Sequence, residues 1–577
     1  MFPLVLLATL ATFSLAKTVR YDFDIGWVTA APDGFARPVQ AVNGQWPLPI
    51  IEANVNDTII VKIHNSLGNE STSLHFHAQY QFGTGTADGP VGVTQCPVYP
   101  GQSYTYKFKA WPPGTHWYHS HAEGAYPDGL RGKMIIHDPD WEASLKIDKQ
   151  IPLSMSDWYH RQMPSLLDEY LGVENRNGNI PIPDAFLFND TTKAPEFVFE
   201  PLKRYLLRIV NMAALTCGTF HLENHNLTVV AIDGRPVVPK NASTILLCAG
   251  QRYDAIVVGQ NAPNTSTQYI AKMEKDMLTN GTAPPDEKLS VIGGISYKRN
   301  GTSVPINPQF TKLLGPWWNP SKVLDDTTLI PRDREPLLKG VTKRINWSTK
   351  QVYYEGIGTR IAVGEQPWTE PKVPSLLTAL STGKSALEPS TYGKGVAPEI
   401  TRLNDIVEIY MENSQPWPHP MHLHGHTFQI AGRGAGTWNG DESVLYPIPA
   451  KRDTVVIPPE GYIVLRYRAN NPGAWFFHCH IDFHVAGGMA AVIIEAPDVL
   501  QKQQSLSAQT ISTCKTSHEC PLGNCACRTG GISVEDSDRE CNTIFNSHGM
   551  TNGSLITWGS NNNTNANNNT SPSYHRT

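Results

Sequence analysis

Residues 473–491 read GAWFFHCHIDFHVAGGMAA, and this stretch decides both the fold and the chemistry. Its first half is apolar and aromatic and follows Pro and Gly, which is typical of a buried β-strand. Side chains alternate between the two faces of a strand, so His478 and His480 point one way and Cys479 the other. Imidazole is a good ligand for copper and zinc. The stretch therefore predicts two neighbouring metal sites on opposite faces of one strand.

The His-x-His pattern occurs three more times. The further pairs are His75-Phe-His77, His119-Ser-His121 and His422-Leu-His424. Residues i and i+2 of a strand lie on the same face, so each pair presents two imidazoles side by side. A single pair is more simply two surface or core histidines, but four pairs in two repeated blocks predict a site for several metal ions.

The odd number of cysteines has an explanation in the same stretch. The chain contains nine Cys. Cys479 is accompanied by His419 upstream and by His484 and Met489 downstream. A Cys, two His and a weak axial Met form the ligand set of a blue-copper electron-transfer site. Cys479 is thus predicted to be a metal thiolate, which leaves eight cysteines to pair.

The chain repeats at the scale of a domain. GTHWYHSH…GLRGKMIIHDP and GAWFFHCH…GGMAAVIIEAP close two blocks alike, and short alternating runs separated by Gly, Pro and Asn indicate β-sandwiches. A middle block has His221 and His225 but no His-x-His pair, so we expect it to be structural. The predicted parts are a signal peptide (1–16), domain 1 (17–140), domain 2 (141–300), an interdomain connection (301–344), domain 3 with the type 1 copper (345–500), and a Cys-containing tail with an Asn/Ser-rich disordered end (501–577).

Composition excludes some partners and indicates the compartment. The 577 residues carry 47 Lys+Arg and 52 Asp+Glu, with no basic stripe, so we expect no nucleic acid partner. The start MFPLVLLATLATFSLA ends in small residues, which is typical of a cleaved signal peptide. It is too short to cross a hydrocarbon core about 30 Å thick. We expect a secreted monomer, extracellular or in the cell wall, without a membrane anchor, and its many Asn-x-Ser/Thr sites agree with that route.

Four segments resemble the copper signatures of the multicopper oxidases: HFHAQYQ, THWYHSH, HPMHLHGH and HCHIDFHVAGGM. The likeness covers the mature chain to about residue 500, and TQCPVYPG, LSMSDWYH and NPGAWFFHCHIDFH are most similar to the fungal ferroxidase and laccase-like branch. The resemblance implies an all-β fold of three consecutive cupredoxin-like Greek-key β-sandwich domains. It also implies four copper ions: one type 1, one type 2 and a binuclear type 3 pair.

The resemblance also assigns ligands, residue by residue. It implies a type 1 copper bound by His419, Cys479 and His484, with Met489 in the axial position. The implied type 2 ligands are His75 and His422, and the implied type 3 ligands are His77, His119, His121, His424, His478 and His480. Asp88 and Asp482 match the acids that deliver protons to oxygen near the trinuclear cluster.

The resemblance also bears on the disulfides and on two departures. Cys217 and Cys248 lie in one domain and are expected to pair. Cys96 matches a family cysteine joined to the tail, and its partner stays open among Cys514, Cys520, Cys525, Cys527 and Cys541. Ala78 stands where the family usually has Gly, which predicts crowding of the backbone. His116 is an additional histidine, which we interpret as a core or channel residue.

The implied reaction passes single electrons from a reducing substrate near His484 or His419 through Cys479 to the cluster, where O2 becomes water. Family ferroxidases bind iron with carboxylates, because hard cations prefer oxygen ligands. Ile180 falls where they carry Glu, whereas Asp276 matches a second acid. Asp441 or Glu442 only loosely replaces a third.

The substrate prediction follows from these acids. We favour a laccase-like enzyme that oxidises phenols or naphthols, whose radicals then couple or polymerise in pigment or secondary-metabolite biosynthesis. The alternative is a ferroxidase that oxidises Fe(II) in iron uptake. A copper-storage or carrier protein would explain His and Cys but not the full ligand set.

Overall fold

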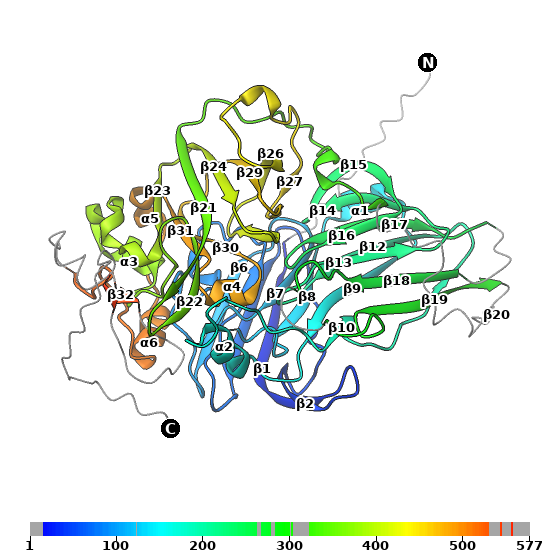
Figure 1. Cartoon of the computed structure of the whole chain (residues 1–577), viewed down its shortest axis with the longest axis horizontal. Coiled ribbons are helices and arrows are strands. Elements are labelled where there is room, and N and C mark those ends of the chain that lie inside the picture. The colour runs from blue at the N-terminus through cyan, green and yellow to red at the C-terminus, as the bar shows by residue number, and fades with distance from the viewer. Residues whose placement is uncertain are drawn as a thin grey trace, which may run out of the picture.

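The computed structural model describes residues 16–122, 124–261, 267–278, 283–299, 302–303, 322–529, 543–544 and 556–557. The predicted signal peptide up to residue 15, part of the predicted interdomain connection and the Asn/Ser-rich end lie outside the described residues. Within the described part, the chain forms three β-sandwich units (Figure 1). The predicted all-β, cupredoxin-like fold is confirmed.

The first unit packs two four-stranded sheets around an apolar core that includes Val61, Phe76 and Met134. One sheet has the order β2-β1-β4-β6, with β1 (Thr18–Ala30), β2 (Arg37–Val42), β4 (Thr58–Asn65) and β6 (Ser103–Lys109). The other has the order β3-β8-β7-β5, with β3 (Ile51–Asn54), β5 (His75–His77), β7 (Gly114–His119) and β8 (Arg131–His137). Residues of β6, SYTYKFK, alternate strictly between exposed and buried, as the pleat requires.

The second unit has two larger sheets. The order β10-β9-β12-β17-β14-β15 contains β9 (Lys149–Trp158), β10 (Ala185–Phe188), β12 (Arg204–Asn211), β14 (Leu227–Ile232), β15 (Arg235–Ala242) and β17 (Arg252–Val258). The order β11-β19-β18-β13-β16 contains β11 (Phe197–Phe199), β13 (Gly218–Leu222), β16 (Thr244–Leu247), β18 (Thr267–Met273) and β19 (Ser290–Arg299), and β20 (Thr302–Ser303) pairs with β19.

The third unit repeats this plan. The order β22-β21-β24-β29-β26-β27 contains β21 (Lys343–Tyr354), β22 (Gly358–Val363), β24 (Ile406–Asn413), β26 (Phe428–Ala435), β27 (Lys451–Arg452) and β29 (Gly461–Arg468). The order β23-β31-β30-β25-β28 contains β23 (Pro398–Thr401), β25 (His419–Leu423), β28 (Thr454–Ile457), β30 (Gly473–Cys479) and β31 (Ala490–Glu495). A further hairpin pairs β32 (Thr543–Ile544) with β33 (Ile556–Thr557).

Strand order makes the three units equivalent. In each unit the first strand pairs in parallel with a later one: β1 with β4, β9 with β12, and β21 with β24. By the same order, β5 and β7 correspond to β13 and β18 and to β25 and β30. The His-x-His pairs lie on or directly after these strands in the first and third units. In the second unit β13 contributes only His221, and β18 has no histidine.

Short helices connect and flank the sheets. They are α1 (Pro139–Ser144), α2 (Met163–Leu171), α3 (Ser375–Ser381), α4 (Asp482–Ala486), α5 (Pro497–Gln503) and α6 (Ala508–Thr516), with 3-10 turns η1 (Gly85–Ala87), η4 (Asp326–Thr328), η5 (Gly383–Leu387), η6 (Pro389–Thr391), η7 (Lys394–Val396) and η8 (Glu442–Val444). The Asp138 and Ser507 side chains cap α1 and α6 by accepting backbone N–H groups. Among the described residues, none of these helices has the length and apolar character needed to cross a bilayer.

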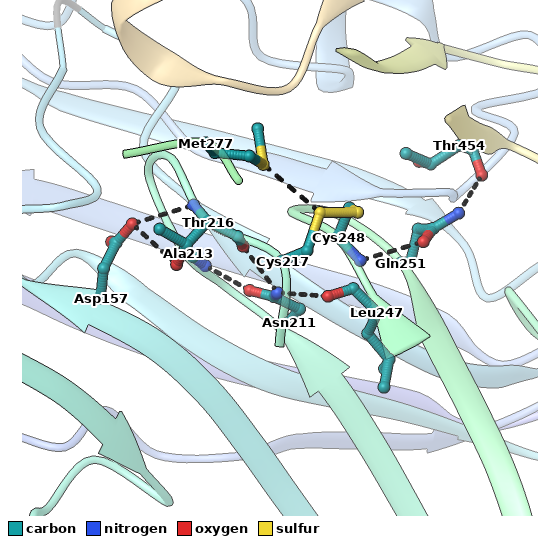
Figure 2. Close-up of a disulfide and its surroundings, with 10 residues drawn as sticks. All are labelled: Asp157, Asn211, Ala213, Thr216, Cys217, Leu247, Cys248, Gln251, Met277 and Thr454. Carbon is teal, nitrogen blue, oxygen red and sulfur yellow. Dashed lines mark hydrogen bonds between the residues drawn. A yellow bond between two sulfur atoms is a disulfide. The ribbon is translucent and has the colours of Figure 1, made fainter. Parts of the chain in front are cut away.

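Three disulfides lie wholly within the described residues and fix loops there. Cys217 pairs with Cys248, as the sequence predicts (Figure 2). Cys96 pairs with Cys514, which ties the tail to the first unit and resolves the choice among the tail cysteines. Cys520 pairs with Cys527. Among the described residues, Cys479 is the free cysteine, as its predicted role requires.

Candidate metal centres

Strand register brings the four histidine pairs together. His75 lies opposite His119 in the β5–β7 pair, and His422 lies opposite His478 in the β25–β30 pair. Between the first and third units, the ring centroids of His77 and His422 are 3.9 Å apart. The histidine cluster between these two units consists of His75, His77, His119, His121, His422, His424, His478 and His480.

The free nitrogens of the cluster fit a metal site. His75, His119 and His422 each bind a backbone carbonyl through Nδ1, and their buried Nε2 atoms have no hydrogen-bond partner among the described residues. Nε2 of His424 faces Nε2 of His478 at 3.0 Å. Buried nitrogens that face one another without a donor are stabilised by a cation that accepts their lone pairs. This donor set fits copper.

Burial also prepares the cluster to bind a metal. The pKa of His119 and of His121 is lowered well below the usual value, by burial first and by neighbouring imidazoles second. Burial, followed by the His422 charge, lowers the pKa of His480 to about 3. The rings of His119, His121 and His480 are thus neutral at physiological pH, and a neutral imidazole is the form that binds metal.

A second donor set lies on the opposite face of β30, as the alternation predicts. Nδ1 of His419 and Nδ1 of His484 are 3.2 Å apart, and the Cys479 Sγ lies 3.7 Å and 3.5 Å from them. Burial raises the pKa of the Cys479 thiol, so a bound metal is what makes it a thiolate. Met489 is fully buried next to this set, because its N–H donates to the His484 carbonyl and its carbonyl accepts from Cys479 N–H. A thiol and two imidazoles with their donor atoms facing inward fit copper.

The two predicted acids occupy different positions at the cluster. Asp88 accepts a hydrogen bond from His424 Nδ1 at 2.8 Å through its carboxylate, and its carbonyl accepts from His75 Nδ1 at 2.7 Å. Asp482 lines a cavity of about 160 Å³ that also reaches His119 and His478. Its buried Oδ2 has no hydrogen-bond partner among the described residues. Burial, helped by two nearby Asp residues, raises the pKa of Asp482 to about 7.

Sequence reasoning missed Asp453. Its Oδ1 lies 3.1 Å from His77 Nε2, and its carbonyl accepts a hydrogen bond from His422 Nδ1 at 2.9 Å. Burial alone would raise the pKa of Asp453, but the Arg252 guanidinium and hydrogen bonds from Arg252, His422 and His77 hold it well below the usual value. Asp453 precedes β28, where Thr454 pairs with His422. The sequence signal would have been an acid at the start of a strand that pairs with a His-x-His strand.

The two departures have clear consequences. Ala78 is buried and adopts φ 71°, a left-handed conformation that favours Gly, so the expected crowding is a backbone strain. His116 is fully buried outside both donor sets. Its Nε2 donates to the Pro112 carbonyl, and its Nδ1 accepts from Arg252. It is therefore a satisfied core histidine, as interpreted from the sequence.

The side of His419 that faces away from Cys479 bears amides. His419 Nε2 donates to Gln415 Oε1 at 2.6 Å, and Gln415 Nε2 donates to the exposed Gln351. Ile180 is half-buried against the apolar core. The loosely matched acids are engaged elsewhere, because Glu442 pairs with Arg466 and the Asp441 carboxylate accepts the Ser443 N–H. Asp276 is exposed at the end of β18. Gln415 is a second residue that sequence reasoning did not single out.

Comparisons with known proteins point to one family. Family models described as multicopper oxidase match residues 24–140, 149–299 and 368–499. The iron transport multicopper oxidase fetC of Epichloe festucae is 38% identical over 533 residues, which cover 91% of this chain and 83% of that protein. The iron transport multicopper oxidase FET3 of Gibberella zeae is 37% identical over 547 residues, 93% of this chain and 86% of that protein.

Solved structures give the same grouping. The crystal structure of Fet3p, a multicopper oxidase that functions in iron import, has a TM-score of 0.83 and 31% identity, and the match covers 88% of this chain and 96% of that one. The laccase from Botrytis aclada has a TM-score of 0.74 and 26% identity, with coverage of 87% and 92%. Similarity is thus greater to the iron-import protein than to the laccase.

Proposed function

The chain belongs to the multicopper oxidase family, and from this premise we propose that it takes single electrons from Fe(II) and uses them to reduce O2 to water. As a member of the family it is a copper-dependent oxidoreductase that uses O2. The choice of Fe(II) rests on one observation: two relatives that cover more than 90% of this chain, fetC and FET3, are iron transport multicopper oxidases. The comparisons therefore support the ferroxidase alternative better than the phenol oxidation that the sequence analysis favoured.

The chain's own residues have separate tasks in this reaction. Bound copper supplies reversible one-electron redox chemistry. His419, Cys479 and His484 would hold one ion, with Met489 beside them, and the eight imidazoles of the histidine cluster would hold the other three. His478 and Cys479 end β30 and His480 follows directly, so the chain joins the two donor sets by a short covalent path.

Protons and oxygen reach the cluster from another side. The cavity lined by His119, His478 and Asp482 gives O2 and water a place beside the cluster. Asp482 Oδ2 is buried and has no hydrogen-bond partner in the described part of the chain, so we assign Asp482 to hold and deliver a proton there. Asp88 contacts His424 and His75 directly, so we assign it to orient these two rings.

A second candidate function is the oxidation of phenols or naphthols. Two observations favour it: His419 Nε2 donates to a neutral amide, Gln415, and an apolar residue, Ile180, stands where the family ferroxidases carry Glu. A carboxylate at either position would attract Fe(II) and stabilise Fe(III). An uncharged aromatic donor needs neither.

Steady-state kinetics separates the two candidates. The ratio kcat/KM is measured for Fe(II) and for a panel of phenols and naphthols, with the wild type and with Gln415→Glu and Ile180→Glu. The proposal predicts a higher kcat/KM for Fe(II) than for any phenol in the wild type, and a further rise for Fe(II) in both variants. Leu403→Glu, at an exposed apolar position before β24, controls for added charge. A wild-type kcat/KM for phenols ten times that for Fe(II) would reject Fe(II) as the substrate.

We also propose that the protein works outside the cytosol. The disulfides Cys96–Cys514 and Cys217–Cys248 belong to an oxidising compartment. We expect the secreted protein to resist alkylation of its cysteines by a thiol reagent. We also expect its mass to fall when glycans are removed enzymatically.

A further inference from the structure

The second unit sends a short segment to the histidine cluster. This segment, Cys248–Arg252 (CAGQR), follows β16 and is here called the Cys248–Arg252 arm. The disulfide to Cys217 fixes its start, and Cys248 N–H donates to the Gln251 side chain at 3.0 Å (Figure 2). The loop around Cys217 is itself anchored, because the Asp157 carboxylate accepts backbone N–H groups of residues 214–216. The arm is therefore a fixed support.

Three consecutive residues of the arm touch the surroundings of the cluster. A Cβ on Gly250 would lie 2.6 Å from the His480 ring, so the backbone there lies directly against that imidazole. Gln251 Nε2 donates to the Thr454 carbonyl at 3.0 Å (Figure 2). Arg252 donates to both carboxylate oxygens of Asp453, at 2.7 Å and 2.6 Å. The unit without His-x-His pairs thus contacts the third unit where that unit contributes cluster residues.

Arg252 fixes Asp453 in one orientation. The guanidinium is fully buried, and its Nε also donates to the Thr115 carbonyl of the first unit at 3.0 Å. A bidentate pair between a planar guanidinium and a carboxylate sets both the distance and the rotation of the carboxylate. Alternating charges continue away from the cluster through Asp233 and Arg452. Asp453 therefore has one available position, set from the second unit.

The position of Asp453 decides which nitrogen His77 offers to the cluster. Nε2 of His77 faces Asp453 Oδ1 at 3.1 Å, and Nδ1 of His77 faces Nε2 of His480 at 3.3 Å. A neutral imidazole has one N–H, and a carboxylate acceptor draws it to the nitrogen that it faces. With the proton on Nε2, the Nδ1 lone pair points to His480 and the cluster. Such outer carboxylates fix the tautomer and ring orientation of ligating histidines.

We propose that Arg252 is a positioning residue of the histidine cluster: by holding the Asp453 carboxylate against His77 Nε2, it makes His77 a ligand through Nδ1. The second unit then contributes to metal binding without a ligand of its own. This inference goes beyond the proposed function, because it holds whether the electron donor is Fe(II) or a phenol.

A matched pair of variants tests the proposal. Arg252→Lys keeps the charge but loses the two-pronged contact with Asp453. Arg208→Lys is the control, because Arg208 is equally buried and pairs with Asp254 and Glu142 away from the two donor sets. Readouts are copper per chain during titration with a chelator, the electron paramagnetic resonance of the cluster copper, and the blue absorbance of the Cys479 site.

The proposal predicts that Arg252→Lys releases cluster copper at a chelator concentration at least about tenfold lower than the wild type does. Loss of an outer carboxylate contact to a metal ligand lowers metal affinity by at least about this factor. Its blue absorbance stays at the wild-type value, and Arg208→Lys matches the wild type in both measurements. Wild-type copper retention and resonance in Arg252→Lys would overturn the proposal, as would an equal loss in Arg208→Lys.

A further variant covers the case in which Arg252→Lys does not fold. Gln251→Met removes the hydrogen bond to the Thr454 carbonyl together with the one from Cys248 N–H, and leaves every charge in place. It must show the same selective loss of cluster copper, to a smaller degree. If Arg252→Lys does not fold and folded Gln251→Met retains cluster copper as the wild type does, the Cys248–Arg252 arm has only a structural role and the proposal is overturned.

Discussion

A Cβ added at Gly250 would push directly on the histidine cluster. Gly250 has φ +82°, and the added Cβ would lie 2.6 Å from His480 Cδ2. An ordinary van der Waals contact begins at 3.4 Å, so the ring must move by about 0.8 Å or the backbone must yield. His480 Nε2 lies 3.3 Å from His77 Nδ1, so a shift of this size is a quarter of the spacing between two donor atoms.

The expected cost has two parts that a control separates. An L-residue in the left-handed region costs roughly 1–2 kcal/mol, and overpacking a buried contact adds about 1–3 kcal/mol. Gly68→Ala is the control, because Gly68 has φ +80° and nothing lies within 4 Å of its Cβ position. Gly68→Ala should lower the free energy of unfolding by the backbone cost alone, whereas Gly250→Ala should lower it by the backbone cost and the overpacking cost together.

The assay combines stability with metal content. Thermal unfolding of the copper-free proteins gives the stability difference, and copper analysis with resonance spectra shows whether the cluster is altered. We expect Gly250→Ala to unfold at a lower temperature than Gly68→Ala and to lose cluster copper while keeping its blue absorbance. Equal unfolding temperatures and full copper in both variants would refute the contact between Gly250 and His480 as a constraint on the site.

Two further predictions concern residues beside the cluster. Ala78→Gly should stabilise the protein by about 0.5–1 kcal/mol, because relief of the strain at φ 71° exceeds the entropy lost by Gly; a lower melting temperature would contradict this. Burial keeps the pKa of His116 at about 3 in the folded protein, so only the unfolded chain gains a proton below pH 6.5 and folding weakens as pH falls. Between pH 6.5 and 4.5, His116→Gln should lose about 2–3 kcal/mol less free energy of unfolding than the wild type. Denaturant unfolding of the copper-free protein measures this difference, and an unchanged pH dependence would contradict it.

The strand period explains how much of the site was predictable. Alternation in β5 and β30 places His75 and His77 together and separates Cys479 from its two neighbours, and that needs only local sequence. Asp453 and Arg252 could not be found this way. They are 201 positions apart, and their meeting depends on how the units pack. An acid before β28 becomes a signal only once that strand is known to pair with a His-x-His strand, and no local pattern marks Arg252 as its partner.

The fold was predictable for a related reason, and its details were not. Turn residues between short alternating runs indicated sandwiches, and the repeated His segments indicated which copies carry chemistry. The amide at Gln415 became visible only when His419 Nε2 was found to donate to it. The pairing Cys520–Cys527 likewise depends on the path of the tail, which spacing alone does not determine.

The central claim is that one chain holds copper in two distinct donor sets. The most direct test is the copper content and absorption spectrum of the wild type and of Cys479→Ser. We predict four copper ions per chain and a blue thiolate band for the wild type, and about three ions with no blue band for a folded Cys479→Ser. A blue band that survives in Cys479→Ser, or a colourless wild type loaded with four copper ions, would contradict it.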